Sequence, residues 1–222
     1  EIPAYSYEGG WPVNPKSYEI EDLGFDMPCP GSIGCECQTN TDCDNQNCSA
    51  HPKGNFCVPK QGDLIPRFEA LDQFGESVDL YDFANQGKIT VIELSAAWCS
   101  PCSDLAGWIA TNDHKIRENP WWKDRYLPIR DIVKKGKIQL VNIMFEGPIK
   151  KTTVTQEDVI EWYKKYPDPH VPILADEYRF LHTWVKPTGL PCIFLVDENM
   201  HLINYTSRGL TDAFLYLTNP EK

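Results

Sequence analysis

The stretch that decides the fold of this chain is residues 91–102, which reads VIELSAAWCSPC. An apolar run leads into Trp98 and then into Cys99 and Cys102, two cysteines separated by two residues. Thiol-disulfide exchange needs an accessible thiolate that attacks a disulfide and a second thiol close enough to resolve the mixed disulfide. A spacing of two residues across the start of a helix supplies both, so the stretch predicts a redox-active pair.

Composition indicates where such a pair would work. The chain has 222 residues, of which 41% are hydrophobic, enough for one domain of ordinary size with extensions. No apolar run approaches the roughly 18 residues that a membrane helix needs. The nine cysteines favour an oxidising, extracytoplasmic compartment, periplasmic or secreted. The chain begins at Glu1 rather than at a methionine, which is compatible with a removed signal peptide or lipid anchor. The formal charge of −11 argues against binding to nucleic acid.

Six of the cysteines crowd residues 29–57, among Gly, Pro, Asn, Asp, Ser and Thr and with almost no aliphatic residue. So polar a segment cannot build a core, and we expect three disulfides to order it. The spacing does not decide among the fifteen possible pairings. A zinc cluster is the rival interpretation, although structural zinc sites usually show CxxC pairs. The expected structural disulfides involve Cys29, Cys35, Cys37, Cys43, Cys48 and Cys57.

These observations divide the chain into three parts. Residues 1–28 are rich in Pro, Tyr and Gly without periodicity and predict an extended arm, followed by the cysteine-rich module at 29–61. The redox domain is expected at 62–222, where apolar runs alternate with helical patterns. The predicted strands are 78–83, 89–94, 138–145, 192–196 and 201–205, and the predicted helices are 100–110, 127–135, 155–166 and 211–217. Alternating strands and helices closed by a hairpin predict an α/β domain with a mixed sheet.

Several further motifs follow in order: DLIPRF at 63–68, LDQFG at 71–75, LYDF at 80–83, AWCSPC at 97–102 and GLPCIFLVD at 189–197. Together they resemble thioredoxin-fold proteins of the TlpA/ResA type, which are bacterial extracytoplasmic thiol-disulfide oxidoreductases. The resemblance covers the chain from about Gly62 to its C-terminus. It implies a thioredoxin-like fold, a mixed central sheet flanked by helices, with the disulfide-rich module as an N-terminal extension.

The two cysteines of the motif receive different roles. Cys99 precedes a helix that starts near Ser100, where unpaired N–H groups and the helix dipole stabilise a thiolate, so we expect it to be the nucleophile. Cys102 lies one turn inside and is the expected resolving thiol. An inert structural disulfide is the alternative, but closing so short a loop gains little stability. Neither Ser100 nor Pro101 would strongly stabilise the thiolate, which favours a reductant over a strong oxidant.

Glu93 lies six residues before Cys99 in an otherwise apolar strand. A buried carboxyl there would have a raised pKa and could exchange a proton with Cys102. Thioredoxins carry an acid at the matching position, so the resemblance implies a general acid/base role. A glutamate at a strand end that faces water is the alternative.

The segment around Pro191 is expected to lie opposite the CxxC motif. It resembles the family's cis-proline loop, in which Leu190 would offer its backbone to an extended substrate, and an ordinary trans proline is the alternative. Cys192 departs from the family's usual threonine and is either a third thiol or, as we favour, a buried hydrophobe. Trp98 is expected beside Cys99, shaping the rim and contacting substrate.

The sequence therefore predicts a disulfide reductase that uses no cofactor, because the cysteines themselves carry the electrons. Its expected partners are a disulfide-containing client protein and an external thiol donor, which the resemblance implies is a membrane thiol relay. A peroxidase is disfavoured because its peroxidatic cysteine would follow the pattern PxxxTxxC, which Cys99 does not. A copper(I) metallochaperone using Cys99, Cys102 and Cys192 stays open. So does a partner-binding protein in which the redoxin domain is a scaffold.

Overall fold

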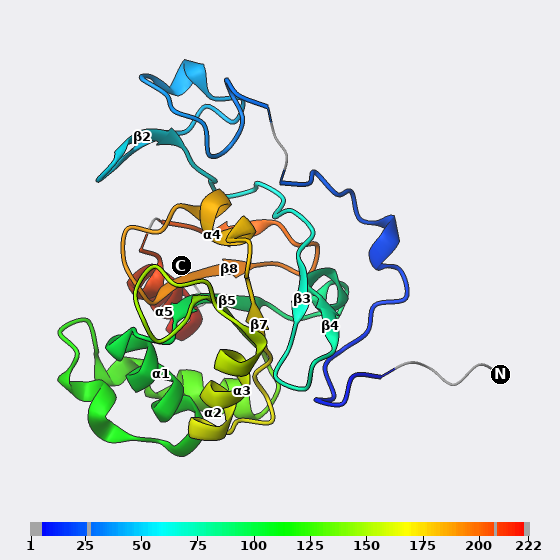
Figure 1. The fold of residues 1–222 in the computed structure, drawn as a ribbon, viewed down its shortest axis with the longest axis vertical. Coiled ribbons are helices and arrows are strands. Elements are labelled where there is room, and N and C mark those ends of the chain that lie inside the picture. The colour runs from blue at the N-terminus through cyan, green and yellow to red at the C-terminus, as the bar shows by residue number, and fades with distance from the viewer. Residues whose placement is uncertain (1–5, 26–27, 207, 220–222) are drawn as a thin grey trace.

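A five-stranded sheet with the order β7-β6-β5-β8-β9 forms the centre of the protein (Figure 1). The computed structural model describes residues 6–25, 28–206 and 208–219. β5, β6 and β7 are parallel, whereas β8 is antiparallel to β5, and β9 to β8. The mixed sheet that the sequence predicts is confirmed. Its strands are β5 (Thr90–Ala96), β6 (Gln139–Glu146), β7 (Ile173–Ala175), β8 (Cys192–Val196) and β9 (Leu202–Asn204).

Helices cover both faces of this sheet. Figure 1 shows α1, α2 and α3 gathered on one side of the sheet and α4 on the other. On the first side, Leu105 of α1 and Phe214 of α5 share a buried cluster with Ile193 of β8, whereas Trp184 of α4 packs with Ile92 in a second cluster. The helices are α1 (Ser100–Thr111), α2 (Leu127–Lys134), α3 (Gln156–Lys165), α4 (Phe180–Val185) and α5 (Leu210–Thr218).

β5 is the central strand, and all seven of its residues are buried. Successive side chains of a strand point to opposite faces, so Val91 packs under α1 while Ile92 and Leu94 face α4. An apolar strand covered on both sides is what residues 89–94 predicted. The same alternation places the polar Glu93 and Ser95 on the α1 side, with Val91.

α3 begins as the sequence predicts. The Thr155 hydroxyl accepts a hydrogen bond from the Asp158 amide, and the Asp158 carboxylate accepts one from the Thr155 amide, which forms a capping box. Val159 and Trp162 are buried in a cluster that also contains Cys99 and Cys102. The cap therefore fixes a helix that forms part of the surroundings of the cysteine pair.

The predicted strand at 78–83 is wrong in its second half. β4 covers only Ser77–Asp79 and pairs with β3 (Glu69–Leu71), and the chain then turns into a 3-10 helix, η3 (Leu80–Phe83). Asp79 ends the strand because its carboxylate caps this helix by accepting the Tyr81 amide at 2.9 Å. All four η3 residues are buried, so their apolar character reflects burial rather than a strand. Three more short 3-10 helices occur among the described residues of the redox domain and the arm: η1 (Ser17–Glu19), η4 (His114–Glu118) and η5 (Asp124–Tyr126).

The N-terminal arm is docked along the β3–β4 hairpin and η3. Tyr7 and Trp11 are both buried, and their polar atoms donate to Asp82 at 2.6 Å and to Asp72 at 2.8 Å. The backbone amide of Asn14 donates to Asp82 as well, at 2.9 Å. Residues 1–5 and 26–27 of the predicted arm, and residues 207 and 220–222 of the predicted redox domain, lie outside the described residues.

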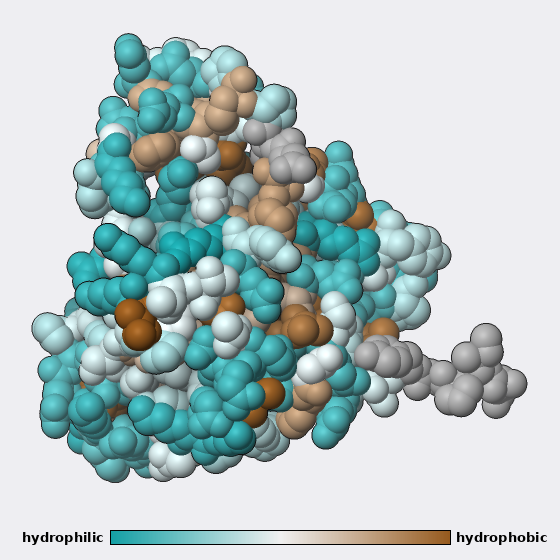
Figure 2. All heavy atoms as spheres, in the orientation of Figure 1, coloured by the Kyte–Doolittle hydropathy of each residue, from teal (hydrophilic) through white to brown (hydrophobic). Residues whose placement is uncertain are grey.

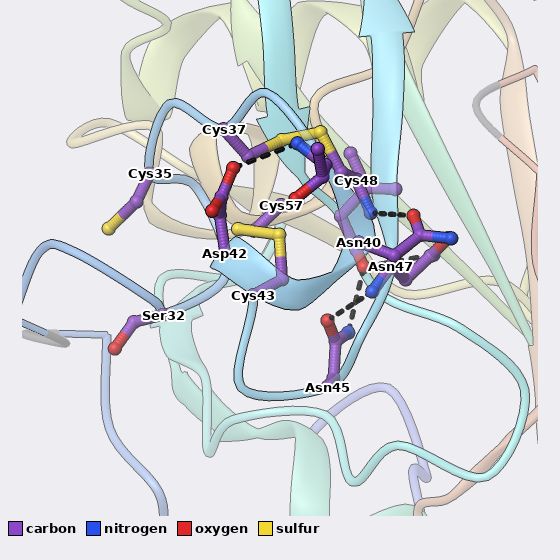
Figure 3. The surroundings of a disulfide bond; sticks show 12 residues. Ser32, Cys35, Cys37, Asn40, Asp42, Cys43, Asn45, Asn47, Cys48 and Cys57 are labelled. Atoms are coloured by element: carbon purple, nitrogen blue, oxygen red, sulfur yellow. Dashed lines mark hydrogen bonds between the residues drawn. A yellow bond between two sulfur atoms is a disulfide. The ribbon is translucent and has the colours of Figure 1, made fainter.

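Three disulfides order the cysteine-rich module, which lies beside α4 at one end of the molecule (Figure 1). Figure 3 shows two of them, Cys37–Cys48 and Cys43–Cys57. Its regular structure is η2 (Asn40–Asp42) and a hairpin of β1 (Cys48–His51) and β2 (Gly54–Cys57). The zinc cluster needs thiolate ligands, and these six sulfurs are bonded to one another instead. The bonded pairs are Cys29–Cys35, Cys37–Cys48 and Cys43–Cys57.

The surface agrees with the composition. The face drawn in Figure 2 is mostly hydrophilic, with apolar residues scattered over it. Within the described ranges, no helix combines the length and the apolar character that crossing a membrane requires.

Candidate active site

The two cysteines of the motif meet at the junction of β5 and α1, where they form a disulfide with a Cα–Cα distance of 5.3 Å. Cys99 is the N-cap of α1, and its Sγ accepts the backbone N–H of Cys102 at 3.2 Å. Pro101 fits the first turn because the N–H that it lacks would have no partner inside the helix. In the reduced protein, the same N–H and the helix dipole would stabilise a thiolate at Cys99.

The disulfide is almost completely covered. Cys99 is 2% exposed and Cys102 is 0% exposed, so the order of their exposure is as expected but Cys99 is far less accessible than the sequence suggested. Trp98 and Leu190, both partly buried, pack against the cluster that contains the two cysteines. A partner that reaches the sulfur of Cys99 must therefore displace part of this cover.

The loop before β8 brings Leu190 to the cluster that contains the cysteine pair. The Leu190–Pro191 peptide bond is cis, and the Leu190 side chain contacts the cysteine cluster. A groove of about 380 Å³ lies beside this loop, and Trp121 and Arg208 are among its other lining residues. Leu190 and Pro191 thus form part of the groove wall, and Leu190 also packs against the cysteine cluster.

Glu93 lies inside the protein, on the α1 side of the sheet. It is 3% exposed and lines a small cavity together with Ala106, which follows Cys102 by one helical turn and so lies on the same face of α1. Burial raises the pKa of Glu93 to about 8, although a 3.0 Å hydrogen bond from Asn142 to Oε2 acts to lower it. The strand-end alternative, in which the carboxyl faces water, does not describe this residue.

Cys192 is buried on the opposite side of the sheet from α1. It pairs with Leu94 in the β5–β8 ladder and packs in the cluster that contains Ile92 and Leu94, whereas Cys99 and Cys102 lie in another cluster. It is not in a disulfide, and burial raises the pKa of its thiol to about 12. These features describe a buried hydrophobe rather than a reactive third thiol.

The proposed copper ligands are not assembled. Among residues 6–25, 28–206 and 208–219, the one group of three His, Cys, Asp or Glu side chains close enough to share a cation is Cys37, Cys43 and Cys57. All three are already in disulfides.

Glu146 is a site residue that the sequence analysis missed. It ends β6 opposite Ala96, and its carboxylate accepts the Trp98 indole N–H at 2.6 Å and pairs with Arg179 at 2.9 Å. Burial acts to raise the pKa of Glu146, but hydrogen bonds from the Lys151 amide, Trp98 and Arg179 lower it overall. An acid at the carboxyl end of a strand parallel to residues 91–96 was the signal that could have revealed it.

The Glu146 contact gives a test of how Trp98 is held. Replacing Glu146 with leucine removes the acceptor, so the Trp98 indole N–H resonance should move upfield, and unfolding should become easier by about 1.5–3 kcal/mol for the lost charged hydrogen bond. Nitrogen-15 NMR spectra, with Trp98→Phe to assign the signal, measure the first effect, and denaturant titration measures the second. A Glu146→Gln variant keeps an acceptor oxygen and should leave the resonance near its original position. An unmoved resonance in the leucine variant would show that Glu146 does not hold the indole.

Two solved structures share this fold. The thioredoxin domain of a thiol-disulfide oxidoreductase from Bacteroides vulgatus superposes with a TM-score of 0.50 and 19% identity, over 73% of this chain and 100% of that one. The chain has a thioredoxin fold. A structure from Bacteroides thetaiotaomicron, described as a candidate protein disulfide isomerase, gives a TM-score of 0.50 and 14% identity over 73% of this chain and 88% of that one. In sequence, no protein-family model and no curated protein matches this chain.

Proposed function

We propose that this thioredoxin-fold chain is a protein disulfide reductase of the TlpA/ResA type that works outside the cytoplasm through Cys99 and Cys102. The observation that carries the proposal is the position of Cys99, whose Sγ caps α1 and accepts the Cys102 amide. That position favours a thiolate, which is the species that attacks a disulfide. The structural neighbours described as oxidoreductases agree with redox chemistry of this general kind.

The first half of the reaction uses Cys99. Its thiolate attacks one sulfur of the client disulfide, the client S–S bond breaks, and the other client sulfur leaves as a thiolate that takes a proton from solvent. A mixed disulfide now joins Cys99 to the client. Leu190 and Pro191 line a groove, and Leu190 also packs against the cysteine cluster, so an extended client segment would lie in this groove.

The second half uses Cys102. Its thiol gives its proton to the Glu93 carboxylate, and the resulting thiolate attacks Cys99 Sγ, which releases the second client thiolate. The client has gained two electrons, and the protein is left with the Cys99–Cys102 disulfide seen in the structure. An external thiol donor must then reduce this disulfide.

The raised pKa of Glu93 suits the regeneration step. With a pKa of about 8 in the disulfide state, the carboxyl holds its proton at neutral pH. When a donor thiolate attacks Cys99, Cys102 leaves as a thiolate and can take that proton. Glu93 then starts the next client cycle ionised, next to a protonated Cys102.

The proposed compartment rests on the cysteine-rich module. Three disulfides outside the active site, in a segment with little apolar core, need an oxidising environment to form and persist. A membrane thiol relay is the donor class that we propose, because a reductant that works in such an environment needs electrons from another compartment.

Reduction of insulin tests the proposed function. The protein is first reduced at Cys99 and Cys102, separated from the reductant and mixed with insulin, and two insulin thiols should form for each Cys99–Cys102 disulfide. Copper(I) binding is measured on the same sample. Tight stoichiometric copper binding without insulin reduction would favour the metallochaperone and contradict the reductase.

A further inference from the structure

A short line of buried polar groups links β5 to β6 beneath the active site. The Ser95 and Asn142 side chains lie 2.7 Å apart between Oγ and Oδ1, and Asn142 Nδ2 donates to Glu93 Oε2 at 3.0 Å. All three residues are at most 3% exposed. Asn142 pairs with Glu93 across the parallel ladder, so its amide is directly beside the carboxyl.

The chemistry of the three groups fixes the direction of the hydrogen bonds. Asn142 Oδ1 can only accept, so the Ser95 hydroxyl must donate to it, and this contact sets the rotation of the amide. The Nδ2 side of the amide then faces Glu93, where it donates to Oε2. An oxygen that accepts this hydrogen bond is the carbonyl oxygen of the protonated acid, so the proton belongs on Oε1.

The other carboxyl oxygen is in a different situation. Within the described part of the chain, Oε1 is buried and has no hydrogen-bond partner. The carboxyl borders a cavity of about 20 Å³, which has room for one water molecule. Ala106 lines the same cavity one turn beyond Cys102, so the carboxyl shares this cavity with the face of α1 that carries the resolving cysteine.

We propose that Asn142, held in place by Ser95, is a positioning residue that keeps the exchangeable proton of Glu93 on Oε1. The role of this proton in turnover rests on the proposed reductase function. Two other titratable groups line the cavity, Tyr166 and Asp168, and Asp168 is paired with Lys134 at 2.6 Å. Neither group is altered in the variants below.

The direct test is spectroscopic and uses the oxidised protein with carbon-13-labelled glutamate. Below the pKa of Glu93, the C=O stretch of its protonated carboxyl should shift to higher frequency in Asn142→Leu, because the carbonyl oxygen loses its donor. The proton affinity of Glu93, from an NMR titration, should rise about tenfold, as expected for loss of one hydrogen bond to the charged form. An unmoved stretch, or a lower proton affinity, would overturn the proposal.

Ser95→Ala is a smaller change that tests the same contact even if Asn142→Leu does not fold. Ser95→Ala lets the amide rotate and should shift the same stretch in the same direction with a smaller rise in proton affinity, roughly threefold. Ser95→Thr keeps the hydroxyl and should match the wild-type protein. Equal spectra for the alanine and threonine variants would show that Ser95 does not hold the amide.

Turnover separates this inference from the proposed function. If the protein reduces insulin, the pH at which its rate changes should move with the measured Glu93 affinity in both Asn142→Leu and Ser95→Ala. If the proton affinity of Glu93 changes but the pH dependence of the rate does not, Glu93 does not control turnover in this way. If the wild-type protein reduces no insulin but the C=O and NMR signals respond as expected, the proton placement stands and the reductase proposal alone fails.

Discussion

Replacing Cys99 with serine is expected to abolish disulfide exchange, whereas replacing Cys102 with serine should stop the reaction halfway. A serine hydroxyl is hardly ionised near neutral pH and cannot form a disulfide, so the first variant has no attacking group. The second keeps the nucleophile but lacks the thiol that resolves the intermediate. It should accumulate a covalent adduct between Cys99 and the client, visible on a non-reducing gel.

Cys192→Ala is the matched control, because it removes the remaining thiol from the opposite side of the sheet. It should reduce insulin at the wild-type rate and lose only the stability of a small buried side chain. Loss of exchange in this variant, with its fold intact, would revive the three-thiol centre. Wild-type exchange by Cys99→Ser would instead remove the nucleophile from the proposed mechanism.

Replacing Glu93 with glutamine should stabilise the protein more and more as the pH rises from about 5 to about 8. The pKa of Glu93 is raised by burial to about 8 in the folded protein and lies near 4.5 in the unfolded chain, so the folded state binds the proton more tightly. Below the pKa of the unfolded chain, the carboxyl is protonated in both the folded and the unfolded state, so it adds no pH dependence to the free energy of unfolding. Between the two pKa values, the free energy of unfolding of the wild-type protein falls as the pH rises. Above the pKa of the folded state, the whole loss, on the order of a few kcal/mol, is present.

Denaturant unfolding of the oxidised protein at a series of pH values measures this effect. The slope of unfolding free energy against pH should be flatter in Glu93→Gln than in the wild-type protein. The exposed Glu177 offers a control, since Glu177→Gln should keep the wild-type slope. Identical slopes for wild type and Glu93→Gln would mean that the carboxyl is not buried as the structure shows.

The central part of the site could be predicted because local patterns determine it. A seven-residue segment with four apolar side chains is buried as β5, and Pro101 after a capping Cys99 lies in the first turn of α1 where the sequence indicates. Glu93 stood out because a carboxyl is costly inside such a strand. The Thr155 and Asp158 capping box is equally local, since its partners are three residues apart.

Contacts between distant segments could not be predicted in this way. Glu146 reaches Trp98 only because β6 lies beside β5 in a particular register, and Asn142 reaches Glu93 for the same reason. The disulfide pairing depends on how the module folds, because six cysteines in a polar segment fit many loops. Residues 80–83 were predicted as a strand because the apolar pattern does not reveal that the Asp79 side chain caps a 3-10 helix there.

The docking of the arm also constrains the order in which the chain can fold. Tyr7 finds its partner Asp82 75 residues later, and Trp11 finds Asp72 61 residues later. The arm, which precedes the hairpin in the chain, therefore cannot reach its place until the β3–β4 hairpin and η3 exist to receive it. Such distant contacts form late because the loop between them must close first. The arm can thus dock only after the cysteine-rich module and the hairpin that follow it in the chain have been synthesised.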